Sequence, residues 1–131
     1  MVILDSDMLI GVLRGDTEAV SAMEKLERAG EKLATTAINS FELFEGAFLN
    51  PKPLETMVKV DLLLRAFDIL SLNQAISKTA AEISAGLRRK GNPIDFQDIA
   101  IAAIAISNSG KLVTRNIKHF SRIKGLEVEK W

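Results

Sequence analysis

Short apolar runs alternate with longer segments of helical pattern along the whole chain, and this alternation limits the fold more than any other feature. The first run, residues 1–4 (MVIL), is continuously apolar, which is typical of a strand buried on both faces. Four further runs have strand character, at residues 32–38, 68–72, 111–114 and 126–131. Strands that alternate with helices form a mostly parallel sheet with helices on both faces. We therefore expect one α/β domain over residues 1–131, with three α/β/α layers and four to five strands.

The segments between these runs have the spacing of helices. Gly15 and Gly30 mark the ends of the first two helices, and Pro51 lies just beyond the third. The segment at residues 95–110 is almost entirely apolar, so it should be buried against the sheet. The predicted helices cover residues 7–15, 17–30, 39–50, 54–67, 73–91, 95–110 and 116–123.

Composition excludes several kinds of site. The chain has no cysteine, which removes disulfides, thiolate metal sites and cysteine nucleophiles, and a single histidine, His119, cannot build a site of several imidazoles. The 17 Lys and Arg residues balance 17 Asp and Glu residues, which argues against a binder that is basic overall. The start of the chain does not resemble a signal peptide, and its longest apolar stretch, residues 99–106, is too short for a bilayer. We expect a soluble protein of the cytoplasm.

Acidic and amide side chains follow the predicted strands. Asp5 ends the first strand, Asn116 follows the fourth by two residues, Glu42 lies on the helix after the second, and Asp98 lies near the start of the buried helix. Sites in open parallel sheets form outside the carboxyl ends of the strands. If the first and fourth strands are neighbours, these side chains meet at one edge.

Several carboxylates in one cleft repel each other unless a cation neutralises them. Oxygen ligands without His or Cys select Mg²⁺ or Mn²⁺ over zinc. Such ions suit the hydrolysis of phosphodiesters, because they generate hydroxide and stabilise the leaving oxygen. The pattern therefore favours a metal-dependent hydrolase of nucleic acids.

Each acid also has a purely structural interpretation. Asp5 can cap the helix that follows it, and Asp7 in the first helical turn favours the helix dipole. Periodicity does not choose between Glu42 and Glu45, since both border the same apolar arc.

Asp95 and Asp98 form a second ambiguous pair. They are three residues apart and can form a pair like a capping box, with Asp95 as the cap. The structural interpretation is weaker for Asp98, because the helix behind it must be buried. Its carboxylate should then face the edge of the sheet.

Four stretches resemble PIN-domain proteins and, more narrowly, the VapC-type ribonuclease toxins of type II toxin–antitoxin systems. They are VILDSDMLIGVLRG, TTAINSFELFEGA, GNPIDFQDIAIAAIA and LVTRNIKHFSRIKGLEVEKW, in this order over nearly the whole chain. The resemblance implies a ribonuclease site that holds Mg²⁺ or Mn²⁺ on acids. Asp5 matches the first acid, Glu42 the second in an E-L-x-x-G pattern, and Asp98 the third in a D-x-x-I-A pattern.

The resemblance also implies supporting positions. Asn116 lies where some relatives have an acid, and its uncharged amide argues against direct metal binding there, whereas Asp7 lies where many relatives have Asn. Ser6 and Thr114 match hydroxyl positions that can hold carboxylates or water in place. Asp95 is an extra acid, either a cap or an outer ligand.

An RNA substrate, a homodimer and an antitoxin that blocks the site are further implications of the resemblance. Arg14 matches a position that relatives use for antitoxin or substrate contacts. Basic residues just past the fourth strand can hold phosphates, and equally they can form a solvated helix face; the candidates are Arg115, Lys118 and Arg122, with His119 and Lys124 beside them. The apolar stripes at residues 41–49 and 57–64 can form the dimer interface or belong to the core.

Two alternatives belong to other classes. A phosphotransferase of the haloacid-dehalogenase type also starts with an apolar strand and D-x-D, but Leu9 lies where it needs Thr or Val. Lys111 lies at the wrong end of its strand for a catalytic lysine, and no acidic pair lies between Asp98 and Glu127. The other alternative is a PIN-like module that binds RNA or a protein without cutting, which the uncharged Asn116 supports.

Overall fold

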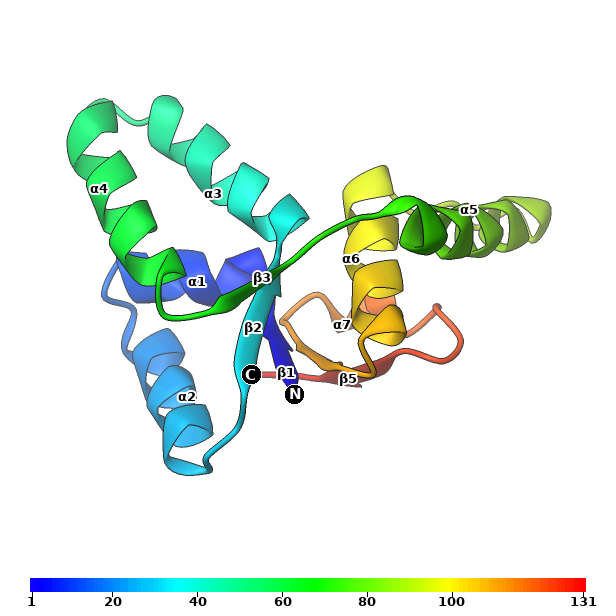
Figure 1. The fold of residues 1–131 in the computed structure, drawn as a ribbon, viewed down its shortest axis with the longest axis horizontal. Coiled ribbons are helices and arrows are strands. Elements are labelled where there is room, and N and C mark those ends of the chain that lie inside the picture. Colours follow the sequence, from blue (N-terminus) through cyan, green and yellow to red (C-terminus); the bar gives the residue numbers. More distant parts are fainter.

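Five strands and seven helices follow one another in the computed structural model, which describes all 131 residues (Figure 1). The first half of the chain contains β1 (Val2–Leu4), α1 (Ser6–Leu13), α2 (Thr17–Arg28), β2 (Leu33–Thr36), α3 (Ala37–Phe48) and α4 (Pro53–Leu64). The second half contains β3 (Asp68–Leu70), α5 (Gln74–Arg89), α6 (Phe96–Ser107), β4 (Lys111–Val113), α7 (Ile117–Phe120) and β5 (Glu127–Glu129).

The five strands form one sheet in the order β3-β2-β1-β4-β5, and all four pairings are parallel. The first strand is therefore the central one, between β2 and β4. Leu4 pairs with Val113, so β1 and β4 end at the same edge. The neighbour relation on which the predicted site depends is confirmed.

Alternate residues of β1 face two different cores. Ile3 packs with the buried residues of α5, α6 and α7, whereas Val2 and Leu4 pack with those of α1, α2, α3 and α4. Figure 1 shows these two groups of helices on opposite sides of the sheet. The three-layer α/β/α architecture is thus confirmed.

The predicted helices and strands are all present, and the errors lie at their ends. The apolar character of residues 37 and 38 extends the predicted second strand too far, because α3 already begins at Ala37. The reason is a cap: Thr36 Oγ1 accepts hydrogen bonds from the backbone N–H groups of Ile38 and Asn39, both at 3.2 Å. Gly15 and Gly30 follow α1 and α2 with φ of +71°, as their predicted role at helix ends requires.

Helix α6 is buried as its composition predicts. All residues from Ile99 to Ala105 are buried between the sheet and α5. No helix of the structure combines the length and apolar character that a membrane crossing needs.

Candidate active site

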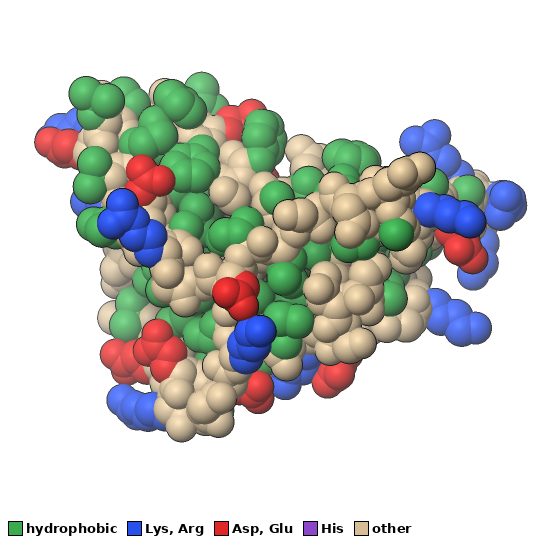
Figure 2. Space-filling model, in the orientation of Figure 1, with side chains coloured by type: hydrophobic (Ala, Val, Ile, Leu, Met, Phe, Trp, Pro, Cys, Tyr) green, Lys and Arg blue, Asp and Glu red, His purple; other side chains and the backbone are tan.

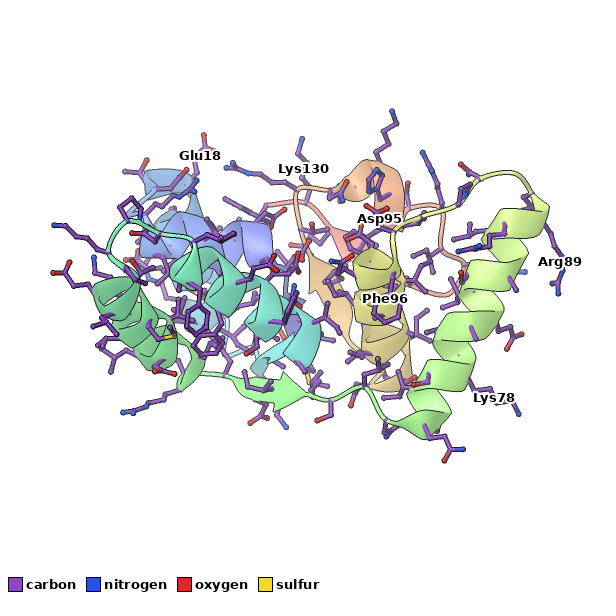
Figure 3. All side chains as sticks on the ribbon, turned by 90° about the horizontal axis from the view of Figure 1, so that it is seen from above. Glu18, Lys78, Arg89, Asp95, Phe96 and Lys130 are labelled. Carbon is purple, nitrogen blue, oxygen red and sulfur yellow. The ribbon has the colours of Figure 1, made fainter.

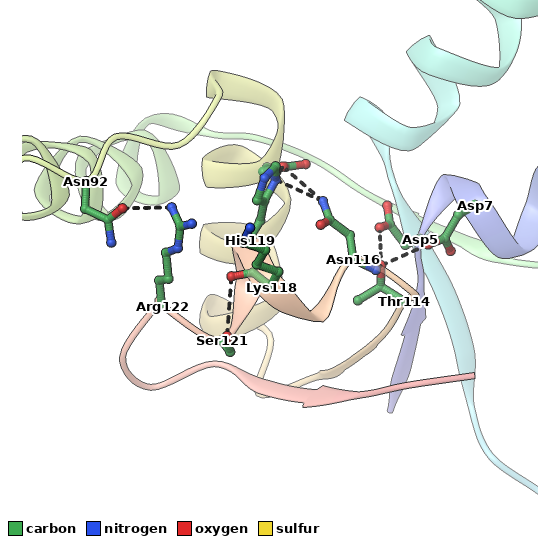
Figure 4. Close-up of polar contacts among 10 residues, drawn as sticks. Asp5, Asp7, Asn92, Thr114, Asn116, Lys118, His119, Ser121 and Arg122 are labelled. Carbon is green, nitrogen blue, oxygen red and sulfur yellow. Dashed lines mark hydrogen bonds and ion pairs between the residues drawn. The ribbon is translucent and has the colours of Figure 1, made fainter.

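Asp5 is the centre of the polar cluster at the carboxyl edge of the sheet. It follows β1 directly, and its backbone N–H donates to the carbonyl of Val113, so it lies beside the end of β4. Its Oδ1 accepts from the backbone N–H of Ser6 at 2.8 Å and from Asn39 Nδ2 at 2.9 Å. Its Oδ2 accepts from Thr114 Oγ1 at 2.6 Å (Figure 4). All of these donors are uncharged.

Burial raises the pKa of Asp5 from its ordinary 3.8 to about 6, because only 8% of the residue is exposed. The charges of Asp7 and Glu42 contribute to this rise, and the hydrogen bonds from Thr114 and Ser6 oppose it, so that about 6 is the net result. Asp5 caps α1 through Ser6, as its structural interpretation predicts. A cap alone, however, needs neither burial nor two further donors.

Glu42 comes to this edge from α3, which packs against both α1 and α6. Its Oε1 accepts from Ser6 Oγ at 2.9 Å, and Asn39 Nδ2 donates to the same hydroxyl at 2.9 Å. Partial burial raises the pKa of Glu42, and the charge of Asp98 adds to the rise. Glu45 is exposed and makes no such contact, so the structure selects Glu42 from the pair that periodicity leaves open.

Asp98 lies in the first turn of α6 and faces α7. Its Oδ2 is 3.1 Å from His119 Nδ1 and 3.5 Å from Asn116 Nδ2, and Asn116 Nδ2 is 3.1 Å from the same ring nitrogen. Asn116 thus contacts an acid of the site through its amide nitrogen.

Asp95 does not have the role predicted for a cap. It is the residue before α6, but its side chain accepts no capping hydrogen bond, and it is exposed. Figure 3 shows it at the start of α6, beside Phe96. The predicted capping box with Asp98 is therefore wrong, because the proximity in sequence is not matched by side-chain direction.

Asp7 holds the segment that follows β4. Its Oδ2 accepts from the backbone N–H of Arg115 at 2.7 Å and from Thr114 Oγ1 at 3.1 Å. Its Oδ1 accepts from Trp131 Nε1 at 2.9 Å. Because each of its two oxygens accepts a hydrogen bond, Asp7 links α1 to the residues after β4 and to Trp131.

Two members of the cluster are absent from the sequence prediction. Asn39 donates to both Asp5 and Ser6, and Trp131 donates to Asp7. A signal exists for Asn39, because it lies three residues beyond the end of β2 at the same edge of the sheet. No local pattern indicates the contact of Trp131.

Three of the four predicted basic residues do not gather around the acids. Arg115 forms an ion pair with Glu18, and its guanidinium lies 3.7 Å from the centre of the Trp131 ring. Arg122 donates to Asn92 at 2.9 Å, and Lys118 is exposed.

Arg14, the fourth, shares a cavity with a site acid. It lines a cavity of about 230 Å³ between α1, α3 and α4, together with Glu42 and Lys59. This cavity opens beside the cluster of acids, on the α1–α4 side of the sheet.

The donor chemistry of the site fits a hard cation. The side chains of Asp5, Glu42 and Asp98 offer only oxygen atoms as ligands. Their charges are coupled, because the charge of Glu42 raises the pKa of Asp5 and the charge of Asp98 raises the pKa of Glu42. No Lys or Arg forms an ion pair with any of the three acids. As the side chains lie, no three acidic groups converge closely enough to enclose an ion. For the three acids to hold one ion together, at least one side chain must change its rotamer, and the exposed side of the cluster leaves room for that change.

Comparison with known proteins gives one family over almost the whole chain. The PIN domain family matches residues 2–126. Ribonuclease VapC1 of Haemophilus influenzae is 26% identical over 128 residues, which are 98% of this chain and 96% of the relative. The tRNA(fMet)-specific endonuclease VapC of Shigella flexneri is 27% identical with the same coverage.

A solved structure has the same fold. The crystal structure of VapBC2 from Rickettsia felis bound to a DNA fragment from their promoter matches with a TM-score of 0.90 and 27% identity, and the match covers 100% of this chain and 99% of that chain. The resemblance predicted from four motifs is thus confirmed over the whole domain. The chain belongs to the PIN domain family and is a VapC-like member of it.

Proposed function

We propose that this chain is a metal-dependent endoribonuclease and the toxin of a toxin–antitoxin pair. The observation that carries the proposal is the cluster of Asp5, Glu42 and Asp98. These acids lie at one edge of the sheet, their charges are coupled, no Lys or Arg forms an ion pair with them, and His119 is the one basic side chain in contact, at Asp98. Similar proteins are a ribonuclease and a tRNA-specific endonuclease, and both activities agree with such a site.

We assign Mg²⁺ or Mn²⁺ to the oxygens of Asp5, Glu42 and Asp98. Such an ion, when bound, lowers the pKa of water and stabilises negative charge on a phosphodiester. The other residues position the acids: Asn39 and Thr114 fix the two oxygens of Asp5, and Ser6 fixes Glu42. Asn116 and His119 hold Asp98 from the other side.

The two alternatives are less well supported by the geometry. Lys111 pairs with Glu129 and lies beside Val2, at the edge of the sheet opposite Asp5, so a phosphotransferase would lack its lysine at the reacting group. A non-catalytic module has no need for coupled acids without a counter-ion. Asn116 donates to Asp98 in this structure, so its lack of charge does not by itself disable the three acids.

We further propose that α3 and α4 form the interface of a homodimer. The apolar stripes of these helices are divided: Leu43 and Val60 are buried in the core, whereas other members face outward. Figure 2 shows apolar side chains gathered over these two helices. The outward-facing residues are Phe41, Phe48, Leu49, Leu54, Val58 and Leu62.

The antitoxin is assigned to the cavity beside Glu42. The similar structure from Rickettsia felis is a VapBC2 complex, and Arg14 and Lys59 give this cavity positive groups next to an acid of the site. A segment bound there would block access to Glu42. We place the protein in the cytoplasm, where its RNA substrate occurs.

Incubation with total cellular RNA tests the proposal. The protein is compared in Mg²⁺, in Mn²⁺ and in EDTA, beside Asp5→Asn and the control Asp61→Asn, which changes an exposed acid of α4. Cleavage that needs the metal ion and Asp5, but not Asp61, is the expected result. Intact RNA together with the absence of Mn²⁺ binding in calorimetry would refute the nuclease and leave the binding module.

A further inference from the structure

Six basic residues form a surface that the candidate active site does not use. Arg88, Arg89 and Lys90 lie at the end of α5, and Lys118, Arg122 and Lys124 lie on and after α7; together they form what is called the cationic ridge below. The chain has no Asp or Glu between residues 83 and 94, and none between residues 99 and 126, although it is neutral overall. Figure 2 shows blue side chains at the end of the molecule that α5 forms.

The two halves of the cationic ridge are joined in the structure. Arg122 Nη1 donates to Asn92 Oδ1 at 2.9 Å, which ties the segment after α7 to the segment after α5. Lys90, Arg122 and Lys124 line one cavity of about 370 Å³, in which Glu82 is the single acid. Three members of the ridge therefore share one surface, whereas Arg88 lines a neighbouring cavity with Ile94 and Phe96.

The charges of the cationic ridge are not neutralised. None of its six residues forms an ion pair, whereas Arg28, Lys32, Lys111 and Arg115 each have an acidic partner. Every member except Arg122 is exposed, and Figure 3 shows Arg89 pointing outward from the end of α5. Basic residues in a last turn do favour a helix dipole, by about 0.3–1 kcal/mol. That effect accounts for the residues at the end of α5 and for Lys118 in the last turn of α7, but not for Arg122 and Lys124.

The ridge continues directly from the candidate active site. His119, which contacts Asp98, lies on α7 between Asn116 and Arg122. Figure 4 shows these groups in a row from Asp5 through Asn116 and His119 to Arg122 and Asn92. A polymer with its reacting bond at Asp98 therefore meets the ridge when it leaves the site along α7.

We propose that the cationic ridge binds the phosphate backbone of a folded RNA outside the segment that is cleaved. The inference rests on the proposed nuclease function. Unpaired Lys and Arg side chains bind phosphates with little regard to sequence and fix the register of a nucleic acid. A protein partner would need an apolar anchor, but no large apolar side chain is exposed between Lys118 and Lys124, and the exposed Phe96 lies with Arg88 in a separate cavity on another side of α5.

The test compares two triple variants in an Asp5→Asn background, in which bound RNA stays intact. The ridge variant is Arg88→Gln, Arg89→Gln and Lys90→Gln. The control variant is Lys25→Gln, Arg28→Gln and Lys32→Gln, which changes the net charge equally on and after α2. Fluorescence anisotropy measures binding to labelled total tRNA and to a random RNA of about eight nucleotides, a length within the footprint of one site.

We expect the ridge variant alone to bind tRNA more weakly, by about fivefold for each phosphate that is no longer neutralised at about 0.1 M salt. The slope of log affinity against log salt should fall by about 2 to 3, because each neutralised phosphate adds about 0.7 to this slope in a single strand and about 0.9 in a duplex. Affinity for the short RNA should not change. With Asp5 restored, the ridge variant should still cleave the short RNA at the parent rate.

The inference would be overturned if the ridge variant bound tRNA as tightly as its Asp5→Asn parent. It would also be overturned if the ridge and control variants lost the same amount of affinity relative to that parent. A second variant, Lys118→Gln with Lys124→Gln, provides an independent measurement if the first fails to fold. Failure of the nuclease proposal would be detected separately, because the protein with Asp5 in place would then not cleave RNA. A ridge-specific loss of tRNA affinity without cleavage would show RNA binding at the ridge but would overturn the part of the inference that concerns a cleaved segment.

Discussion

Replacing Asp5 by Asn is expected to remove activity and to stabilise the metal-free protein above pH 6. The pKa of Asp5 is raised from 3.8 to about 6, so the folded state holds this carboxyl in its charged form at a cost. At about 1.36 kcal/mol for each pH unit, the difference corresponds to about 3 kcal/mol at pH 8. The new amide can keep the network intact. Its oxygen accepts from Ser6 and Asn39, and its nitrogen donates to Thr114, whose hydroxyl can turn toward Asp7.

The direction in which the free energy of unfolding changes with pH follows from the same raised pKa of Asp5. Between pH 3.8 and 6 the folded state binds more protons at Asp5 than the unfolded state, so stability falls as the pH rises through this window and stays low above it. This group alone should make the wild type about 1.4 kcal/mol more stable at pH 5 than at pH 8. Asp5→Asn should lack that difference, whereas the control Asp61→Asn should keep it.

Urea unfolding in EDTA at both pH values measures these quantities. Adding Mn²⁺ at about 100 times its dissociation constant should stabilise the wild type by about 2.7 kcal/mol and leave Asp5→Asn unchanged. An Asp5→Asn protein that is less stable than the wild type at pH 8 would refute the prediction. It would mean that Asp5 holds the fold together as a charged group.

Four further substitutions test the support of the site and the packing of the helices, each by urea unfolding. Thr114→Val removes the hydroxyl that contacts Asp5 and Asp7, so it should cost about 1–3 kcal/mol, more at pH 8 than at pH 5; an equal cost at both values contradicts the assigned contact. Trp131→Phe keeps a ring beside Arg115 but removes the N–H bound to Asp7, and a cost of about 1.5 kcal/mol is expected. Gly11→Ala should cost about 1–3 kcal/mol, because its Cβ would lie 2.6 Å from that of Ala19. Gly86→Ala, with no neighbour within 4 Å, should instead be neutral or stabilising.

The fold could be predicted from the sequence because its layers need different apolar patterns. A strand buried on both faces must be apolar at every position, as residues 2–4 are, and a helix covered on all sides must be apolar all round, as α6 is. The strand order could not be determined in this way, because several orders satisfy the same alternation. The observed helix ends differ from the predicted ones for a local reason, because a capping side chain such as Thr36 starts a helix even where the next residues are apolar.

The acids of the site could be chosen partly from the strand ends and partly from the resemblance. The contacts that orient them could not be predicted. Asn39 reaches Asp5 only because α3 begins at the end of β2, the strand beside β1, and Trp131 reaches Asp7 only because the chain returns beside α1 after β5. Asp95 shows the opposite error: its spacing from Asp98 suits a capping box, but its side chain accepts no capping hydrogen bond.

The central position of β1 has a consequence for the order in which this protein assembles. The chain makes Asp5 early and Thr114 109 residues later, yet the two side chains are bonded in the folded protein. While β4 is still inside the ribosome, β1 lacks one of its two partner strands, and Ile3 lacks its cover by Leu112. A nascent chain that already contains all three acids therefore still lacks the framework that aligns them. Under the proposed function, cleavage competence therefore arrives only after β4 has left the exit tunnel and has paired with β1.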